Sequence, residues 1–169
     1  MLRDRYDPPL SPYDYTSPLS GMRSYIKDHK KDVLLTVHNL PAGTPVKLAV
    51  MDRFDGTVWN LSDSSEATDS SNYHRVGTTI KADEQGKSFT ATFTVDQGLT
   101  DTWLPLAGAA TGVSFANDAD NGNDTFYYNT DTDSAIIPAG TRKGLTYTES
   151  GIIARNPTDK QISSAAAAR

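Results

Sequence analysis

The stretch SFTATFTV at residues 88–95 restricts the fold of this chain more than any other feature. Its apolar residues, Phe89, Ala91, Phe93 and Val95, alternate without interruption with serine and threonine. Successive side chains of a β-strand point to opposite faces of the sheet, so this alternation predicts a strand with one buried face and one polar face.

Weaker segments of the same kind occur along much of the chain. Short β-prone runs, separated by turn signals, lie at 33–40, 45–50, around Trp103, and at 112–116, 125–129, 134–137 and 145–154. Roughly nine short strands of this kind are typical of a sandwich or barrel. The sequence therefore predicts an all-β fold, a two-layer β-sandwich that is Ig-like in the broad sense.

The length of 169 residues suits one domain with short appendages. The prolines of residues 1–16 predict an extended N-terminal arm. Ser17 as N-cap and Pro18 at the first helical position predict one short amphipathic helix near 18–29, with Leu19, Met22, Ile26 and His29 at helical spacing. The β-sandwich domain is then expected over 17–154, and a linker or tail over 155–169.

Composition excludes several classes of function. The net charge of −5 argues against nucleic acid as a partner. The chain has no cysteine, which removes disulfides, thiolate nucleophiles and cysteine-ligated zinc. Its three histidines lie far apart, so the sequence predicts no metal site built on histidine, and no motif in it indicates a cofactor. No apolar run approaches the ~20 residues that span a bilayer, so no direct membrane insertion by this segment is expected.

The stretch MDRFDGTVWNL at 51–61 combines a turn signal with a carboxylate and two aromatic rings. An Asp-Gly pair between apolar runs predicts a two-residue type I′ turn at Asp55 and Gly56. This register places Asp52 opposite Trp59 and puts Trp59 on the core side of the hairpin. Asp52 is then either a solvated carboxylate at the rim, which is favoured, or a general acid or base.

Two further regions contain candidate binding residues. Trp103, Tyr127 and Tyr128, together with Asp52, offer a possible surface for stacking on sugars or peptides, although such rings in a sandwich more often pack in the core. The loop ANDADNGND at 116–124 carries oxygen ligands, but its spacing does not fit an EF-hand. Calcium binding there is left open, and a solvated turn is favoured.

Five stretches, taken in their order along the chain, resemble one known family. They are RDRYDPPLSPYDYTSPLSGMRSYIKD, VKLAVMDRFDGTVWNL, YHRVG, TWLPLAG and GLTYT, and they cover most of residues 3–148. This order resembles the extracellular region of bacterial membrane-bound transglutaminase-like proteins of the TgpA type. In that family a β-rich domain precedes a transglutaminase core that uses a Cys-His-Asp triad.

The resemblance implies a non-catalytic extracellular domain, cut from a larger membrane protein, that positions the catalytic core or contributes to substrate binding. Because this chain has no cysteine, no catalytic residue of the family can be assigned to it. The implied partner is the catalytic domain of the same polypeptide, with a cell-surface protein or glycan as a further possibility. The alternatives are an independent carbohydrate- or peptide-binding module and, at lower weight, a hydrolase built on Asp52 and Asp55.

Overall fold

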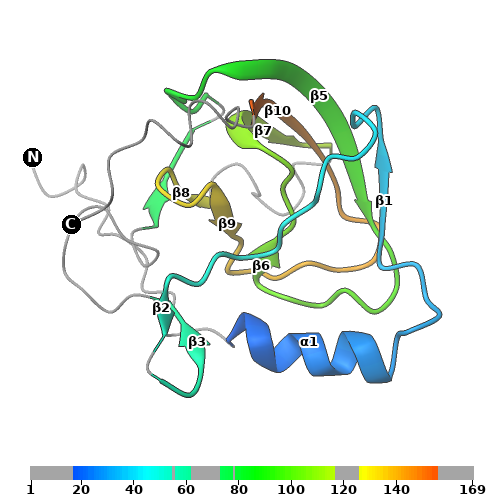
Figure 1. The fold of residues 1–169 in the computed structure, drawn as a ribbon. Helices are drawn as coiled ribbons and strands as arrows, with labels where there is room; N and C mark the ends of the chain where they lie inside the picture. Colours follow the sequence, from blue (N-terminus) through cyan, green and yellow to red (C-terminus); the bar gives the residue numbers. More distant parts are fainter. Residues whose placement is uncertain (1–16, 55, 62–72, 78, 117–125, 156–169) are drawn as a thin grey trace, which may run out of the picture.

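The computed structural model describes residues 17–54, 56–61, 73–77, 79–116 and 126–155. Within these ranges the chain forms two four-stranded antiparallel sheets, a separate two-stranded hairpin and one helix (Figure 1). Residues from both four-stranded sheets form the larger of the two hydrophobic clusters found among the described residues. This arrangement confirms the predicted all-β sandwich with one short helix.

The first sheet has the strand order β1-β5-β10-β7. Its strands are β1 (Leu35–His38), β5 (Gly86–Val95), β7 (Ala109–Phe115) and β10 (Thr146–Ala154). The alternation of β5 is confirmed, because Phe89, Ala91, Phe93 and Val95 are all buried. On the neighbouring strand Tyr147 stacks on Phe93, with ring centroids 5.1 Å apart.

The second sheet has the order β4-β8-β9-β6 and consists of short strands. These are β4 (His74–Arg75), β6 (Trp103–Leu104), β8 (Tyr127–Asn129) and β9 (Ser134–Ile136). Both residues of β6 are fully buried. Leu104 packs in the larger cluster with Tyr128 and Ala135, whereas Trp103 packs in the smaller one with Leu61, Tyr73 and Ile136. The predicted strand at 45–50 does not form; it is reduced to a single bridge between Lys47 and Leu106.

Helix α1 (Pro18–Lys27) forms close to where it was predicted, with proline at its start. Its buried side differs from the predicted one, because Met22 and Ile26 are exposed and the helix instead packs through Gly21 and Tyr25. The small residue at 21 permits this close approach, since a Cβ atom there would lie 3.0 Å from Oδ2 of Asp101.

The hairpin of β2 (Arg53–Phe54) and β3 (Trp59–Asn60) corrects two predictions. Phe54 pairs with Trp59 rather than with Thr57, so the loop has four residues and the two-residue turn is wrong. Gly56 does adopt the predicted positive φ, at +97°, whereas Asp55 lies outside the described residues. Trp59 is 53% exposed rather than in the core, because the longer loop leaves it at the hairpin tip beyond the sandwich.

Several predicted segments cannot be compared with the structure. The arm at 1–16, the calcium-type loop after residue 116 and the tail after residue 155 all lie outside the described residues. The domain boundaries at 17 and 154 therefore stay predictions.

Candidate functional site: a groove beside helix α1 and a buried polar network

A groove of about 370 Å³ lies between helix α1 and two loops of the sandwich. One loop precedes β6 and contains Gly98, Asp101 and Thr102, and the other follows β9 at residues 138–141. The hydroxyl group of Tyr25 donates a hydrogen bond of 2.8 Å to Oδ2 of Asp101. This bond links the helix to the loop along one side of the groove.

The carboxylate of Asp101 is held in place by its own loop. Its Oδ1 accepts hydrogen bonds from the backbone N–H of Thr102 at 2.8 Å and of Trp103 at 3.3 Å. The backbone N–H of Asp101 donates a hydrogen bond to Oγ1 of Thr141, and this bond ties the two loops together. Burial, and secondarily the Asp101 carboxylate, raise the pKa of Tyr25 well above its usual range, so Tyr25 stays a neutral donor.

His29 lines the groove just beyond the C-terminal end of helix α1. Its Nδ1 lies 2.8 Å from Oδ2 of Asp32, and its ring packs directly on Gly98. A Cβ atom at Gly98 would come within 2.7 Å of that ring, so glycine is needed there for packing as well as for its φ of +100°. Within the described ranges no group of histidine, aspartate and glutamate side chains is arranged to hold a metal ion. The groove thus offers hydrogen bonds and one carboxylate to a ligand.

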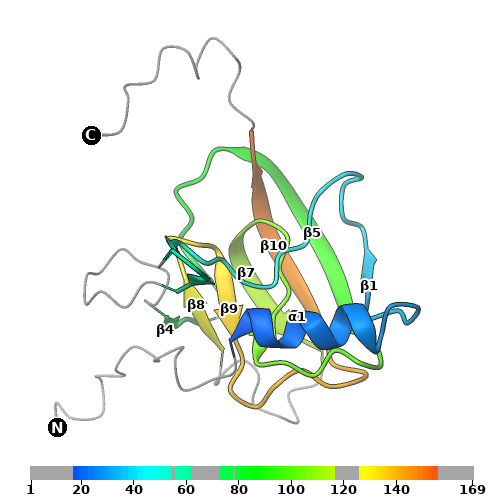
Figure 2. The same ribbon diagram turned by 60° about the horizontal axis from the view of Figure 1, so that its bottom comes forward.

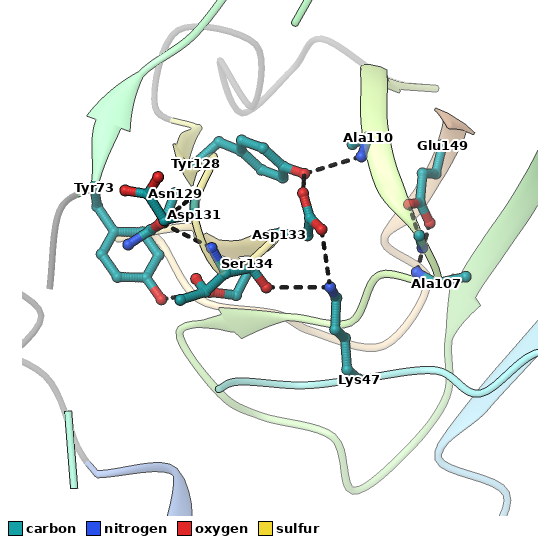
Figure 3. A network of polar contacts seen from close by, with 12 residues as sticks. Lys47, Tyr73, Ala107, Ala110, Tyr128, Asn129, Asp131, Asp133, Ser134 and Glu149 are labelled. Atoms are coloured by element: carbon teal, nitrogen blue, oxygen red, sulfur yellow. Dashed lines mark hydrogen bonds and ion pairs between the residues drawn. The ribbon is translucent and has the colours of Figure 1, made fainter. Parts of the chain in front are cut away.

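A second polar region lies inside the sandwich, and Figure 3 shows Glu149 at one side of it. This side chain is fully buried on β10, and its carboxylate accepts hydrogen bonds from the backbone N–H of Ala107 at 2.8 Å and of Gly108 at 3.1 Å. Burial raises the pKa of Glu149 to about 7, and these two donors and Lys47 only partly oppose the effect. The carboxylate holds the segment between β6 and β7 against β10.

The rest of this network connects β7, β8 and the turn that follows β8. Tyr128 donates to Oδ1 of Asp133 at 2.9 Å and accepts from the backbone N–H of Ala110 at 2.9 Å. Nζ of Lys47 donates to the Thr132 carbonyl oxygen at 3.1 Å and lies 3.6 Å from Oδ2 of Asp133 (Figure 3). These hydrogen bonds and the ion pair join β7, β8 and the following turn to the segment that carries Lys47, so the network stabilises the sandwich.

The predicted site residues occupy quite different environments. Trp103 and Tyr128 are 0% and 2% exposed, which leaves neither ring face free for a surface ligand. Tyr127 is half-buried, with the guanidinium of Arg75 5.8 Å from its ring centroid. Asp52 is exposed, at the base of the hairpin. Binding by Tyr127 and Asp52 stays a prediction, as does any pairing of Asp52 with Asp55.

Sequence reasoning missed Tyr25, Asp101 and Glu149. Glu149 had a usable signal, since it shares the two-residue period of Tyr147 and Gly151, which are both buried. Tyr25 and Asp101 lie 76 positions apart, and nothing in either local sequence indicates their contact.

The family model of the TgpA N-terminal domain matches residues 19–155. The chain therefore belongs to the TgpA N-terminal domain family, which confirms the resemblance seen in the sequence. No curated protein and no solved structure matches it. Among the described residues, no helix has the length and apolar character needed to cross a membrane.

Proposed function

We propose that this chain is a non-catalytic domain on the extracellular face of a bacterial membrane protein, where it positions a transglutaminase-like core or helps that core to bind substrate. Membership of the TgpA N-terminal domain family is the observation that carries the proposal. The absence of cysteine agrees with it, because a transglutaminase-like mechanism requires a thiolate nucleophile.

The groove beside helix α1 is the surface best suited to this contact. It is preformed, because Tyr25, Asp101 and Thr141 fix the helix and both loops by hydrogen bonds. It combines hydroxyl and backbone groups with the Asp101 carboxylate, and such convergent polar groups orient a bound segment.

The test compares two substitutions on the same helix. Ser24 is exposed and lines the groove, so Ser24→Trp should obstruct it, whereas Ser20 is exposed outside the groove and Ser20→Trp serves as the matched control. The chain and the transglutaminase-like domain encoded with it are produced separately, and their association is measured by calorimetry, together with the KM of the joined protein.

We expect Ser24→Trp to weaken association or raise KM by about tenfold or more, and Ser20→Trp to change neither. Equal behaviour of the two variants would contradict a role for the groove. A gene that encodes no cysteine-containing transglutaminase-like region would overturn the proposal altogether.

The same groove supports a second candidate, an independent module that binds a carbohydrate or a peptide. The observation in its favour is an open site of about 370 Å³ lined by hydroxyl groups. Calorimetric titration with cell-wall glycan and peptide fragments should then give heats that Ser24→Trp abolishes. A flat titration across such fragments counts against this candidate.

A further inference from the structure

Large apolar side chains are exposed at one end of the sandwich. Among the described residues seven such side chains are exposed, and all but Val46 belong to two places. The first is helix α1 and the segment after it, and the second is the β2–β3 hairpin. Figure 1 shows both elements at the same end of the molecule, and Figure 2 shows α1 lying across the front of that end.

On helix α1 an apolar row lies beside a basic row. Met22 and Ile26 are one turn apart, 51% and 63% exposed, while Arg23 and Lys27 occupy the adjacent row at the same spacing. Gly21 and Tyr25 take up the inner side, so neither outer row is needed to hold the helix on the sandwich. This pattern is typical of a helix that lies in the interface of a membrane.

The charge of this region is opposite to that of the whole chain. The chain carries a net charge of −5, yet residues 17–32 contain four cations, Arg23, Lys27, Lys30 and Lys31, against two carboxylates, Asp28 and Asp32. No ion pair within the described ranges involves Arg23 or Lys27. A positive region on an acidic protein is complementary to an anionic surface.

The hairpin adds an aromatic pair to the same end. Phe54 and Trp59 pack against each other with ring centroids 5.3 Å apart, and each is 53% exposed. Val58 lies between them in sequence and is also exposed. Tryptophan with an apolar neighbour favours the headgroup region of a bilayer, where the ring leaves water while its N–H stays solvated.

We propose that this end of the sandwich, formed by the outer rows of α1 and the tip of the β2–β3 hairpin, rests on an anionic phospholipid surface. Met22, Ile26, Phe54 and Trp59 reach into the headgroup layer, and the cations of α1 bind lipid phosphates. Lipid fits better than a protein partner, because the centre of a protein interface is depleted of charge, whereas here cations alternate with apolar side chains.

Tryptophan fluorescence provides a direct reporter of this contact. The chain has two tryptophans, and Trp103 is fully buried, so a spectral response to vesicles reports on Trp59. Titration with vesicles of equimolar phosphatidylglycerol and phosphatidylcholine should shift its emission to shorter wavelength and sediment the protein with the lipid. Vesicles of phosphatidylcholine alone should do neither, and added salt should release the protein.

Two double charge reversals make the test specific. Arg23→Glu with Lys27→Glu should weaken partitioning by about 30-fold or more, because each cation near an anionic surface contributes about 1 kcal/mol. Lys81→Glu with Lys87→Glu makes the same change of net charge at exposed positions outside this end, and should bind nearly as the unchanged chain does.

An equal loss of vesicle binding in both double variants would overturn the proposal, because net charge rather than this surface would then determine binding. Absence of any anionic-vesicle binding by the unchanged chain would overturn it as well. Association of this end with a second copy or with the catalytic domain, without vesicle binding, would assign the surface to a protein partner instead.

Discussion

The buried carboxylate of Glu149 should make the stability of this domain depend on pH. Its side chain is 0% exposed, and burial raises its pKa from 4.5 to about 7. The folded protein therefore holds this proton in a pH range where the unfolded chain has already released it. The contribution of Glu149 to stability is fully present below about pH 4.5 and is lost as the pH rises through about 7.

The magnitude follows from that interval. Each pH unit between the two pKa values is worth about 1.4 kcal/mol, so the free energy of unfolding should fall by about 3 kcal/mol between pH 4.5 and about 7. This is a large part of the stability of an ordinary domain, about 5–15 kcal/mol. The N–H groups of Ala107 and Gly108 keep the change from being larger, since they favour the ionised form.

The assay is urea unfolding of the unchanged chain and of Glu149→Gln at about pH 5 and about pH 8, followed by the fluorescence of buried Trp103. Glutamine cannot ionise, so the difference in unfolding free energy between the two proteins should change by about 2–3 kcal/mol between these conditions. The hydrogen bond that is lost on substitution by glutamine costs about the same free energy at both pH values. The contributions of other titrating groups cancel, because they are the same in both proteins.

Glu84→Gln, the same substitution at an exposed position, provides the control. If the difference for Glu149→Gln changed no more with pH than that for Glu84→Gln, to within about 0.5 kcal/mol, the burial argument for Glu149 would be refuted.

Three further substitutions probe the groove, the sandwich and the hairpin. Tyr25→Phe removes the hydrogen bond to Asp101 and should cost about 1 kcal/mol in urea unfolding; an unchanged midpoint would contradict the attachment of the helix through this bond. Gly108→Ala places a Cβ atom 2.6 Å from the backbone oxygen of Ile152 and should cost about 2 kcal/mol, seen as a lower Tm by circular dichroism. Gly56→Val should cost about 1–3 kcal/mol in the same assay through its φ of +97° alone, since nothing lies within 4 Å; an unchanged Tm would contradict that strain.

Local patterns in the sequence predicted the elements that depend on neighbouring residues. Strand β5 and helix α1 both form where alternation and the proline start signal indicated. The positive φ of Gly56 was also predicted, because turn chemistry is local. The length of the loop around it was not, since hairpin register depends on what the flanking residues contact.

The candidate sites required the tertiary structure. Trp103 and Tyr128 were candidates for surface stacking, and their burial in two separate hydrophobic clusters removed them from any surface contact. The groove exists because Tyr25 meets Asp101 across 76 positions, a contact with no sequence signal. The apolar side of α1 faces outward, because the sandwich packs against the side of the helix that carries Gly21 and Tyr25.

By itself the sequence determined the strand-rich class of this protein, the short helix that begins at Pro18 and the lack of a thiolate, because period, proline placement and composition are properties of short segments. It also carried the family resemblance, which depends on the order of motifs rather than on their contacts. Only the tertiary structure decided that Glu149 is buried, that Trp59 is exposed and that α1 presents a basic and apolar surface. Burial is set by which distant elements pack together, and no local pattern contains that information.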